Sequence, residues 1–268
     1  MRPGWNDVQG NQSLSASAVE RETMTKSGNP PLSKAQIEEL KQFDTPTVAN
    51  ALELLGPWDR VSRIMSPRIR ALFPEMKPLV GYAGTFLFST RHPAQGKLYA
   101  DWSDYWHYVL TLPEPRVSVG QDIDPQPSAG SLWGEVQANI HLALGCVGVV
   151  LEGAVRDLDP MRALGYPCFA REVVVGHAYA HLIDFGHAVE VGDVVVHPGD
   201  LIYADQHGVM IVPYEAAPRL AETCRRILNS EKRLIAVCKD RENFSVERLT
   251  KAFEQFAQEY PVEGPPTV

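Results

Sequence analysis

Hydrophobic residues near the start of the chain recur at the spacing of a helix. Val48, Leu52 and Leu55 fall on one face of the segment "DTPTVANALELLG". Thr45 is a suitable N-cap before this face, and Gly56 is suited to end a helix after it. The pattern therefore predicts a helix between Thr45 and Gly56 that packs on the core.

The middle of the chain carries apolar runs with the length and composition of buried strands. The runs at 80–90 and 146–153 ("CVGVVLEG") are rich in β-branched or aromatic residues. Between them we expect a short helix in an aromatic-rich segment and a strand that ends before Asp122. Another helix is expected to begin near Glu135 and to end at Gly145. This alternation predicts a mixed α/β fold.

The last third of the chain changes from short strands to long helices. Short apolar runs separated by Gly-Asp pairs fill 187–213, which predicts strands joined by tight turns. Two helices are expected after them, one over about 214–237 and one beginning after Ser245. We therefore expect strands that pair both parallel and antiparallel, followed by a helical end.

Three stretches of different character divide the chain. Residues 1–31 are rich in Ser, Asn and Gly, which predicts a flexible N-terminal tail. Residues 32–260 are expected to form one α/β domain with its C-terminal helices, and residues 261–268 a loose C-terminal tail. The folded part is thus expected to be a single domain.

Composition and charge narrow the classes of function. The chain has 268 residues, 44% of them hydrophobic and 22% charged, which is typical of a globular protein with a sizeable core. Its formal net charge of −8 and lack of a basic cluster argue against a nucleic-acid partner. No apolar run has the length of a membrane span or the pattern of a signal peptide, so no membrane partner is expected. The four cysteines form no C-x-x-C pair, which favours the reducing cytoplasm.

Charged residues stand at both ends of the helix-then-strand unit in the middle of the chain. Glu135 opens the predicted helix, and Arg156 and Asp157 follow the predicted strand. A chain that returns through a strand brings the residues after it close to the start of the preceding helix. The first amides of that helix have no internal acceptors and lie at the positive end of the helix dipole. The sequence therefore predicts one site built from an anion cradle, a guanidinium and two carboxylates.

These groups suit the binding of a 2-oxo acid beside a metal ion. Arg156 and the amides of Val136 and Gln137 are expected to hold a carboxylate. Asp157 is expected to ligate a hard divalent ion, Mg²⁺ or Mn²⁺, and Glu135 to hold the waters of that ion. A metal beside a 2-oxo acid stabilises an enolate, which favours cleavage of the adjacent carbon–carbon bond.

Simpler interpretations exist for each of these residues. An Arg-Asp pair in a turn is often only a surface ion pair, and Glu135 is also what a helix dipole favours in a first turn. Asp205, in "ADQHG", is expected to brace a hairpin turn through backbone hydrogen bonds. Trp102 and its aromatic neighbours through Tyr108 suit a substrate wall, a subunit contact or, by default, the core.

A second polar cluster contains three histidines. His177, His181 and His187 occur with Asp184, but no cysteine joins them and their spacing matches no common zinc template. A zinc site, a substrate-lining segment and a plain polar loop are the three interpretations. If the segment shapes the distal pocket, replacing His181 should change the preference among oxo acids and leave pyruvate binding nearly intact.

The motifs together resemble a known family. Glu135 followed after twenty residues by Arg156-Asp157 resembles the D/E-x20-R-D motif of the family named after the regulator of ribonuclease E activity A, the RraA-like family. "GSLWGE", "GAVRD" and "HPGDLIYADQHGVMIVP" are similar to further segments of that family, and "FDTPTVANALELLG" to its N-terminal helix. The likeness extends by motif order from Ser33 to Pro213.

The resemblance implies a fold, an assembly and a reaction. The family's fold is an α/β domain of the swivelling β/β/α type, here with flanking N- and C-terminal helices, and its members form trimers or hexamers with sites at subunit interfaces. It implies a 4-hydroxy-4-methyl-2-oxoglutarate aldolase-like lyase that cleaves a 4-hydroxy-2-oxo acid and releases pyruvate, with oxaloacetate decarboxylation as a possible side activity. The resemblance gives Asp157 as the direct metal ligand, Glu135 as a ligand through water and Arg156 as the group that holds the oxo acid.

Two departures from the family pattern bear on the substrate. The segment "AREVVVGHAYAHLIDFGHAVEV" lacks the basic turn of many aldolase members, and the aromatic block at 99–108 is longer than in small members. Both are expected to reshape the distal pocket, so Trp133 and His181 join Arg156, Val136 and Gln137 in the expected substrate-binding set. The alternatives are a non-catalytic regulator of a ribonuclease and a different metal-enolate reaction, such as a decarboxylase or hydratase.

Overall fold

The computed structural model describes residues 31–94 and 99–260. The tails expected at 1–31 and 261–268 therefore lie, apart from Pro31, outside the described residues. The described helices are α1 (Lys34–Leu40), α2 (Thr45–Leu55), α3 (Trp102–Leu110), α4 (Glu135–Ala143), α5 (Leu158–Ala163), α6 (Ala217–Lys239) and α7 (Val246–Glu259). The strands are β1 (Arg70–Ala71), β2 (Leu79–Ser89), β3 (Arg116–Asp122), β4 (Ser131–Trp133), β5 (Cys146–Val155), β6 (Cys168–Val173), β7 (His181–Phe185), β8 (Val189–Val191), β9 (Val194–Val196), β10 (Leu201–Asp205) and β11 (Gly208–Val212).

A mixed sheet organises the body of the molecule. Its strand order is β1-β6-β5-β3-β2-β10-β11, with β4 beside β5 and β7 beside β2. The centre is parallel, because β3 runs parallel to both β2 and β5, and β5 runs parallel to β6 and β4. The strands toward both edges are antiparallel. The predicted mixed α/β fold, with strands of both senses, is confirmed.

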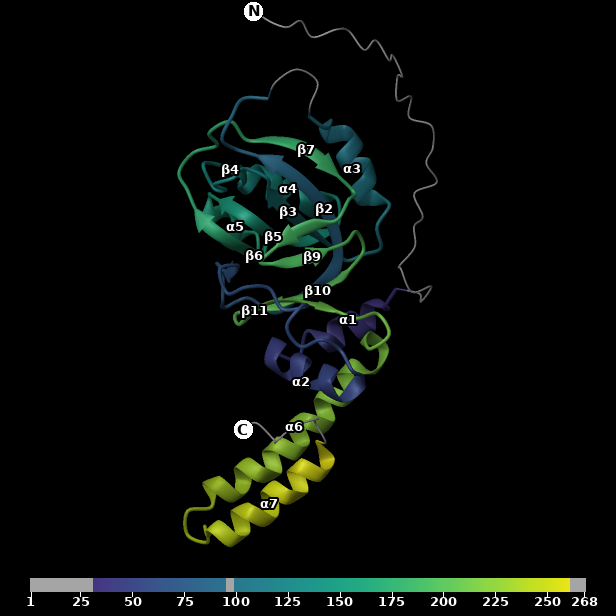
Figure 1. The fold of residues 1–268 in the computed structure, drawn as a ribbon, viewed down its shortest axis with the longest axis vertical. Helices are drawn as coiled ribbons and strands as arrows, with labels where there is room; N and C mark the ends of the chain where they lie inside the picture. Colours follow the sequence, from purple (N-terminus) through teal and green to yellow (C-terminus); the bar gives the residue numbers. More distant parts are fainter. Residues whose placement is uncertain (1–30, 95–98, 261–268) are drawn as a thin grey trace, which may run out of the picture.

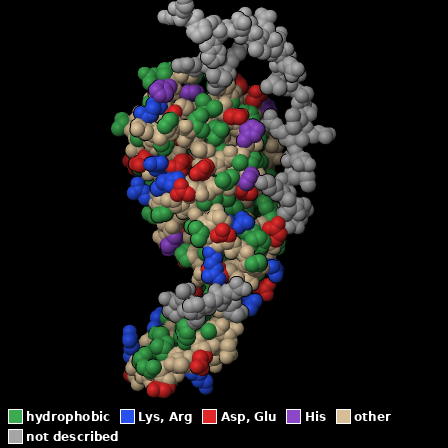
Figure 2. Space-filling view, viewed as in Figure 1, with side chains coloured by type: hydrophobic (Ala, Val, Ile, Leu, Met, Phe, Trp, Pro, Cys, Tyr) green, Lys and Arg blue, Asp and Glu red, His purple; other side chains and the backbone are tan. Residues whose placement is uncertain are grey.

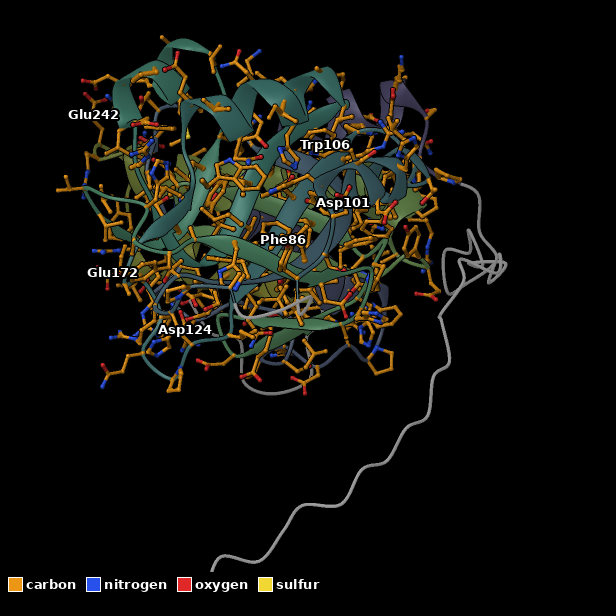
Figure 3. The ribbon with its side chains drawn as sticks, turned by 90° about the horizontal axis from the view of Figure 1, so that it is seen from above. Phe86, Asp101, Trp106, Asp124, Glu172 and Glu242 are labelled. Carbon is orange, nitrogen blue, oxygen red and sulfur yellow. The ribbon has the colours of Figure 1, made fainter. Side chains whose placement is uncertain are left out.

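Three buried clusters hold the layers together. One lies under α3, α4 and α5 on one face of the central strands, and Phe86 of β2 is part of it. A second lies between the other face and the β8–β9 hairpin. The third joins α1, α2 and α6 to β2, β10 and β11. Seen from above, Phe86 lies near the middle of the body, with Asp101 and Trp106 to one side and Asp124 and Glu172 to the other (Figure 3).

The carboxyl-terminal helices leave the body. In Figure 1, α6 runs away from the sheet and α7 returns beside it, so that the two form a hairpin below α1 and α2. The α7 helix has no buried residue, and hydrophobic side chains are visible on the hairpin (Figure 2). The α7 helix begins after Ser245, as the sequence predicted, and Ser245 caps it by accepting a hydrogen bond from the Arg248 amide. Within the described residues, no helix has both the length and the apolar character needed to cross a membrane.

The start of α2 differs from the sequence prediction. Asp44, and not Thr45, is the N-cap, and its carboxylate accepts a hydrogen bond from the Thr47 amide. Thr45 is used elsewhere: its amide and hydroxyl donate to the two carboxylate oxygens of Asp205, at 2.8 and 2.7 Å. Asp205 also accepts the His207 amide, so it braces its own turn as expected and ties that turn to α2 as well. At the far end, Gly56 is extended with φ 169°, so the helix does not end in a left-handed glycine.

Two short strands were missed in segments that the sequence analysis treated as loops. Residues 131–133 form β4 because they pair with the end of β5, and His181–Phe185 form β7 because they pair with β2. The strand at 146–153 continues to Val155, and β3 includes Asp122, where the sequence analysis ended the strand before that residue. Neither β4 nor β7 has a long apolar run, so partners distant in sequence determine them.

Candidate functional site

The end of β5 and the start of α4 lie side by side. Trp133 of β4 pairs with Val155, the last residue of β5, and the Arg156 amide donates to the Trp133 carbonyl at 3.1 Å. Residues 156 and 157 are therefore held against the chain that enters α4. The sequence analysis expected Arg156 and Asp157 to return beside Glu135, and the structure brings them together.

Asp157 adopts a backbone conformation that is uncommon for a residue with a side chain. Its φ and ψ are 56° and 47°, in the left-handed region, at the residue that precedes α5. This conformation directs the carboxylate back to α4, where its Oδ2 atom accepts the Glu135 amide at 3.1 Å. Gly134 makes room for this approach, because a Cβ there would lie 2.4 Å from the same oxygen.

The Asp157 carboxylate keeps a free oxygen at the cavity. The Arg156 guanidinium Nε lies 3.6 Å from Oδ2, and both side chains are about one-third exposed, at 30% and 33%. Oδ1 accepts no hydrogen bond from the described residues. The pair is therefore loose, with one carboxylate oxygen and most of the guanidinium donors available to a ligand.

A cavity of about 680 Å³ opens over this pair. Arg156 and Asp157 line it together with Val136 and Gln137 at the start of α4, and the segment 177–181 lines another part of it. Trp102 adds an aromatic face from α3. The volume suits a small organic acid with a bound ion.

The first turn of α4 presents amides to the cavity. Gly134 is the N-cap and makes no side-chain cap hydrogen bond, so the amides of Val136 and Gln137 have no helical or side-chain acceptor among the described residues. Gln137 also has its side-chain Oε1 buried without a hydrogen-bond partner in the described part of the chain. An anion at this end of the helix would gain both the amides and the dipole.

Two aromatic rings, those of Trp133 and His141, pack against each other. Trp133 is 1% exposed, and its ring centroid lies 4.3 Å from that of His141. Burial lowers the pKa of His141 to about 4, so the ring is neutral near pH 7. Trp133 was expected in the substrate-binding set, but its side chain packs in the core and does not line the described cavity. Its contact with a ligand is therefore indirect, through the chain entering α4.

The backbone amide of Glu135 takes part in the site directly, whereas its side chain lies outside the cavity wall. Its amide binds Asp157, while its side chain is exposed and is absent from the described cavity wall. The structure thus gives Glu135 a role in holding Asp157 that the sequence analysis did not predict.

The three histidines separate into two groups. His177 and His181 line the cavity, whereas His187 lies 3.4 Å from Asp184, at the other end of β7. Among the described residues no three His, Cys, Asp or Glu side chains converge as a metal-binding group. The geometry therefore favours the substrate-lining interpretation of His177 and His181 over a zinc site.

A pair of aspartates holds the cavity wall and was not identified from the sequence. Asp124 accepts the amides of Thr90 and Arg91, and the Thr90 carbonyl accepts the Tyr179 amide of the cavity wall. Burial raises the pKa of Asp122, next to it, whereas hydrogen bonds from Thr90 and its neighbours outweigh burial and lower the pKa of Asp124. The sequence signal is the short "DID" motif, which begins at the last residue of β3.

The donor set at Asp157 fits one class of metal ion. A single carboxylate with a free oxygen, in an open polar cavity, suits a hard divalent ion that keeps most of its waters. A structural zinc ion would need four nitrogen or sulfur ligands, which the described cavity does not offer. The arrangement can hold an anion on α4 and Arg156 with a cation beside it.

Comparisons with known proteins agree with this architecture. A family model described as RraA-like, Aldolase/RraA, matches residues 45–211. A putative 4-hydroxy-4-methyl-2-oxoglutarate aldolase of Halalkalibacterium halodurans is 32% identical over 84 residues, which is 31% of this chain and 40% of that protein. Matches to curated relatives span between 21% and 65% of those proteins' own lengths.

Solved structures show the same fold. An uncharacterized protein from Pseudomonas syringae superposes with a TM-score of 0.64 at 24% identity, covering 84% of this chain and 96% of the other. RraAS2 of Streptomyces coelicolor, titled an unusual member of the RNase ES inhibitor RraA protein family, has a TM-score of 0.55 at 22% identity, covering 75% and 96%. At these identities the likeness establishes the fold.

Proposed function

The chain belongs to the RraA-like family, and on that premise we propose that it is a divalent-metal-dependent carbon–carbon lyase that releases pyruvate from a 4-hydroxy-2-oxo acid. The family includes 4-hydroxy-4-methyl-2-oxoglutarate aldolases and inhibitors of ribonuclease E. The observation that carries the proposal is the convergence of Asp157, Arg156 and the first amides of α4 on one cavity.

The substrate carboxylate is bound by the chain's own cationic and amide groups. The Arg156 guanidinium offers a planar pair of donors, and the Val136 and Gln137 amides offer two more from the helix end. Binding from two sides fixes the acid end of a 2-oxo acid, so its keto oxygen lies beside Asp157.

Asp157 would hold Mg²⁺ or Mn²⁺ directly, and Glu135 would hold waters of that ion from outside the cavity wall. The ion, when bound, supplies electrostatic stabilisation of the negative charge that develops on the keto oxygen. Arg156 adds a fixed positive charge at the same end of the substrate. The Glu135 amide keeps the Asp157 carboxylate in place, since it binds Oδ2 and leaves Oδ1 toward the cavity.

The same site would also cleave oxaloacetate. Loss of carbon dioxide from a 2-oxo diacid and cleavage of a 4-hydroxy-2-oxo acid both leave a pyruvate enolate. We therefore expect decarboxylation as a side activity. It uses the same groups for the acid end and breaks the same bond, between C3 and C4, but it releases carbon dioxide and involves no C4 hydroxyl.

A trimer-based assembly, a homotrimer or a homohexamer, and a cytoplasmic location form part of the proposal. RraA-like proteins are typically oligomeric, and the four cysteines are free thiols, which suits a reducing compartment. Light scattering at micromolar concentration should give a mass of three or six chains of 29.7 kDa. A monomer over the whole concentration range would contradict the assembly.

The experiment that tests the function is a screen for pyruvate release. The protein is incubated with a series of 4-hydroxy-2-oxo acids and with oxaloacetate, with Mg²⁺, with Mn²⁺ or with a chelator. We expect turnover that depends on the ion and returns when the ion is restored. Activity that is unchanged by the chelator would contradict the metal-dependent mechanism. No release from any substrate, together with tight binding to a ribonuclease, would favour the non-catalytic regulator.

A further inference from the structure

His181 lies on a paired strand and lines the cavity that contains Arg156 and Asp157. It is the first residue of β7, where it pairs with Ser89 of the long central strand β2. Its side chain lines the same cavity as Arg156 and Asp157. A side chain at the start of a paired strand is held more precisely than one on a free loop.

The protonation pattern of the His181 ring follows from its hydrogen bond. Nδ1 lies 2.7 Å from the Tyr179 carbonyl oxygen, and a carbonyl oxygen can only accept. Nδ1 therefore carries the proton, and in the neutral ring the lone pair is on Nε2. Nε2 makes no hydrogen bond to the described residues, so it is free to accept a proton from a ligand.

Two other histidines make the same hydrogen bond from Nδ1 to a backbone carbonyl but lie elsewhere in the fold. His107 of α3 has Nδ1 2.7 Å from the Ser103 carbonyl, and His141 of α4 has Nδ1 2.7 Å from the Gln137 carbonyl. The His141 Nε2 atom is buried in the core, and His107 is not among the cavity-lining residues. Of these three oriented rings, only that of His181 belongs to a residue that lines the cavity.

The proposed reaction needs such a base. Cleavage of a 4-hydroxy-2-oxo acid begins with removal of the proton of the C4 hydroxyl. Arg156 stays protonated in proteins, and Asp157 is committed to the cation. His177 lines the cavity too, but no hydrogen bond from the described residues orients its ring.

We infer that His181 is the general base of the proposed lyase, an inference that rests on the function proposed above. Its Nε2 takes the proton of the C4 hydroxyl, and the oxygen's electron pair forms the new C4 carbonyl. The bond between C3 and C4 breaks, and its electron pair passes to the pyruvate enolate. The enolate then takes a proton at C3 from the His181 imidazolium, directly or through water, which gives pyruvate and restores the neutral ring.

This role predicts a split between the two activities of one site. Oxaloacetate has no C4 hydroxyl, so its decarboxylation needs the groups that hold the acid end and no base of this kind. Loss of His181 should therefore slow aldol cleavage and spare decarboxylation. A residue that only shapes or supports the cavity would affect both reactions.

The test compares His181→Gln with the matched variant His107→Gln, which removes an equally oriented ring outside the cavity. For His181→Gln we expect kcat for aldol cleavage to fall by about 10²- to 10⁴-fold, the usual contribution of a general base. Decarboxylation should stay within about threefold, because no base acts on the C4 hydroxyl in that reaction. His107→Gln should keep both rates.

Imidazole rescue distinguishes a lost base from a distorted cavity. In His181→Gly, added imidazole should restore aldol cleavage in proportion to its concentration and leave decarboxylation unchanged. Equal loss of both reactions, or unchanged aldol cleavage in His181→Gln, overturns the inference while the proposed function stands. A parent protein that cleaves neither substrate overturns the proposed function and the inference with it.

Discussion

Two carboxylates near the end of β5 have opposite surroundings. Glu152, within the strand, is 7% exposed and accepts hydrogen bonds from Arg68, Arg171 and the Gly192 amide. Asp157, just after the strand, accepts one amide at 3.1 Å and has its arginine at 3.6 Å. The two carboxylates are only five positions apart in the sequence. Protein donors surround that of Glu152, whereas that of Asp157 is accessible to a ligand.

The difference lies in the number of acceptors left free. Both oxygens of Glu152 are filled by protein donors, which ties β5 to β6, to the segment before β1 and to the β8–β9 turn. The side-chain hydrogen bond to Glu152, with that to Asp193, also raises the pKa of Arg68 above its usual range. One oxygen of Asp157 is left to the cavity. A saturated ion-pair network stabilises the fold, whereas an unsaturated one is able to bind a ligand.

The strongest test of this comparison is Asp157→Ala. Because the ion stabilises the transition state, loss of its only proposed protein ligand should lower kcat by about 10³-fold or more. The melting temperature should change little, since the side chain is about one-third exposed and accepts a single amide. Steady-state kinetics with Mg²⁺ and a thermal melt measure the two. Glu135→Gln should lower kcat much less, because water reorients around a neutral amide. Full activity in Asp157→Ala would contradict the metal-enolate mechanism.

Gly134→Ala tests whether the position of the open carboxylate matters. Gly134 is extended, with φ −161°, so alanine adds no backbone strain, but its Cβ would lie 2.4 Å from the Asp157 oxygen. Displacement of the carboxylate by about 1 Å should lower kcat/KM by roughly 10²-fold. Gly176→Ala is the control, because the nearest atom to a Cβ there is 3.9 Å away. Equal kinetics in the two variants would show that Asp157 tolerates movement.

Glu152→Gln should act on stability and leave turnover intact. In this variant an amide NH2 group, which can only donate, would replace one of the carboxylate oxygens that accept from Arg68 and Arg171. Both arginines are about one-third exposed, so the free energy of unfolding should fall by less than for a fully buried ion pair. We expect a loss of about 2 kcal/mol. The melting temperature should fall by about 5 °C for a domain of this size. A large loss of kcat in the folded protein at 25 °C would mean that the two carboxylates are coupled.

Arg156→Lys should have a smaller effect than Asp157→Ala, Gly134→Ala and Glu152→Gln, but a larger one than Glu135→Gln. The charge remains, but an ammonium lacks the planar pair of donors that matches a carboxylate. We expect kcat/KM to fall by about tenfold, mainly through KM, as the bidentate grip is lost. Kinetics over a range of oxo-acid concentrations separates the two constants. A change in kcat alone would place Arg156 at the breaking bond and away from the carboxylate.

Local sequence was enough to identify the central elements and the site. The apolar run at 146–153 and the helix opening at Glu135 have strong patterns of their own, and chain geometry then requires Arg156 and Asp157 to return beside that helix. The Ser245 cap of α7 and the glycine stop of α4 at Gly145, whose φ is 76°, follow equally local rules.

Long-range pairing was the part that sequence reasoning could not supply. β7 is a strand because it pairs with β2. Thr45 is not the N-cap that the sequence predicted, because it binds Asp205, which is distant in sequence but close in space. Trp133 was expected at the substrate, since an aromatic next to a site motif suits either a wall or the core. The register of β4 against β5 decides for the core. The orientation of His181 likewise depends on one backbone carbonyl.

Helices α1 and α2 leave the ribosome first but gain their packing partners last. The buried members of the cluster that covers them come from residues 32–82 and 201–227, and the Asp205 clamp on Thr45 joins positions 160 residues apart. At about 5–20 residues per second, synthesis of the intervening chain takes roughly 10 s or more. During that time the apolar faces of these helices lack their partners from β10, β11 and α6. The domain therefore completes its folding only after its carboxyl-terminal third has emerged.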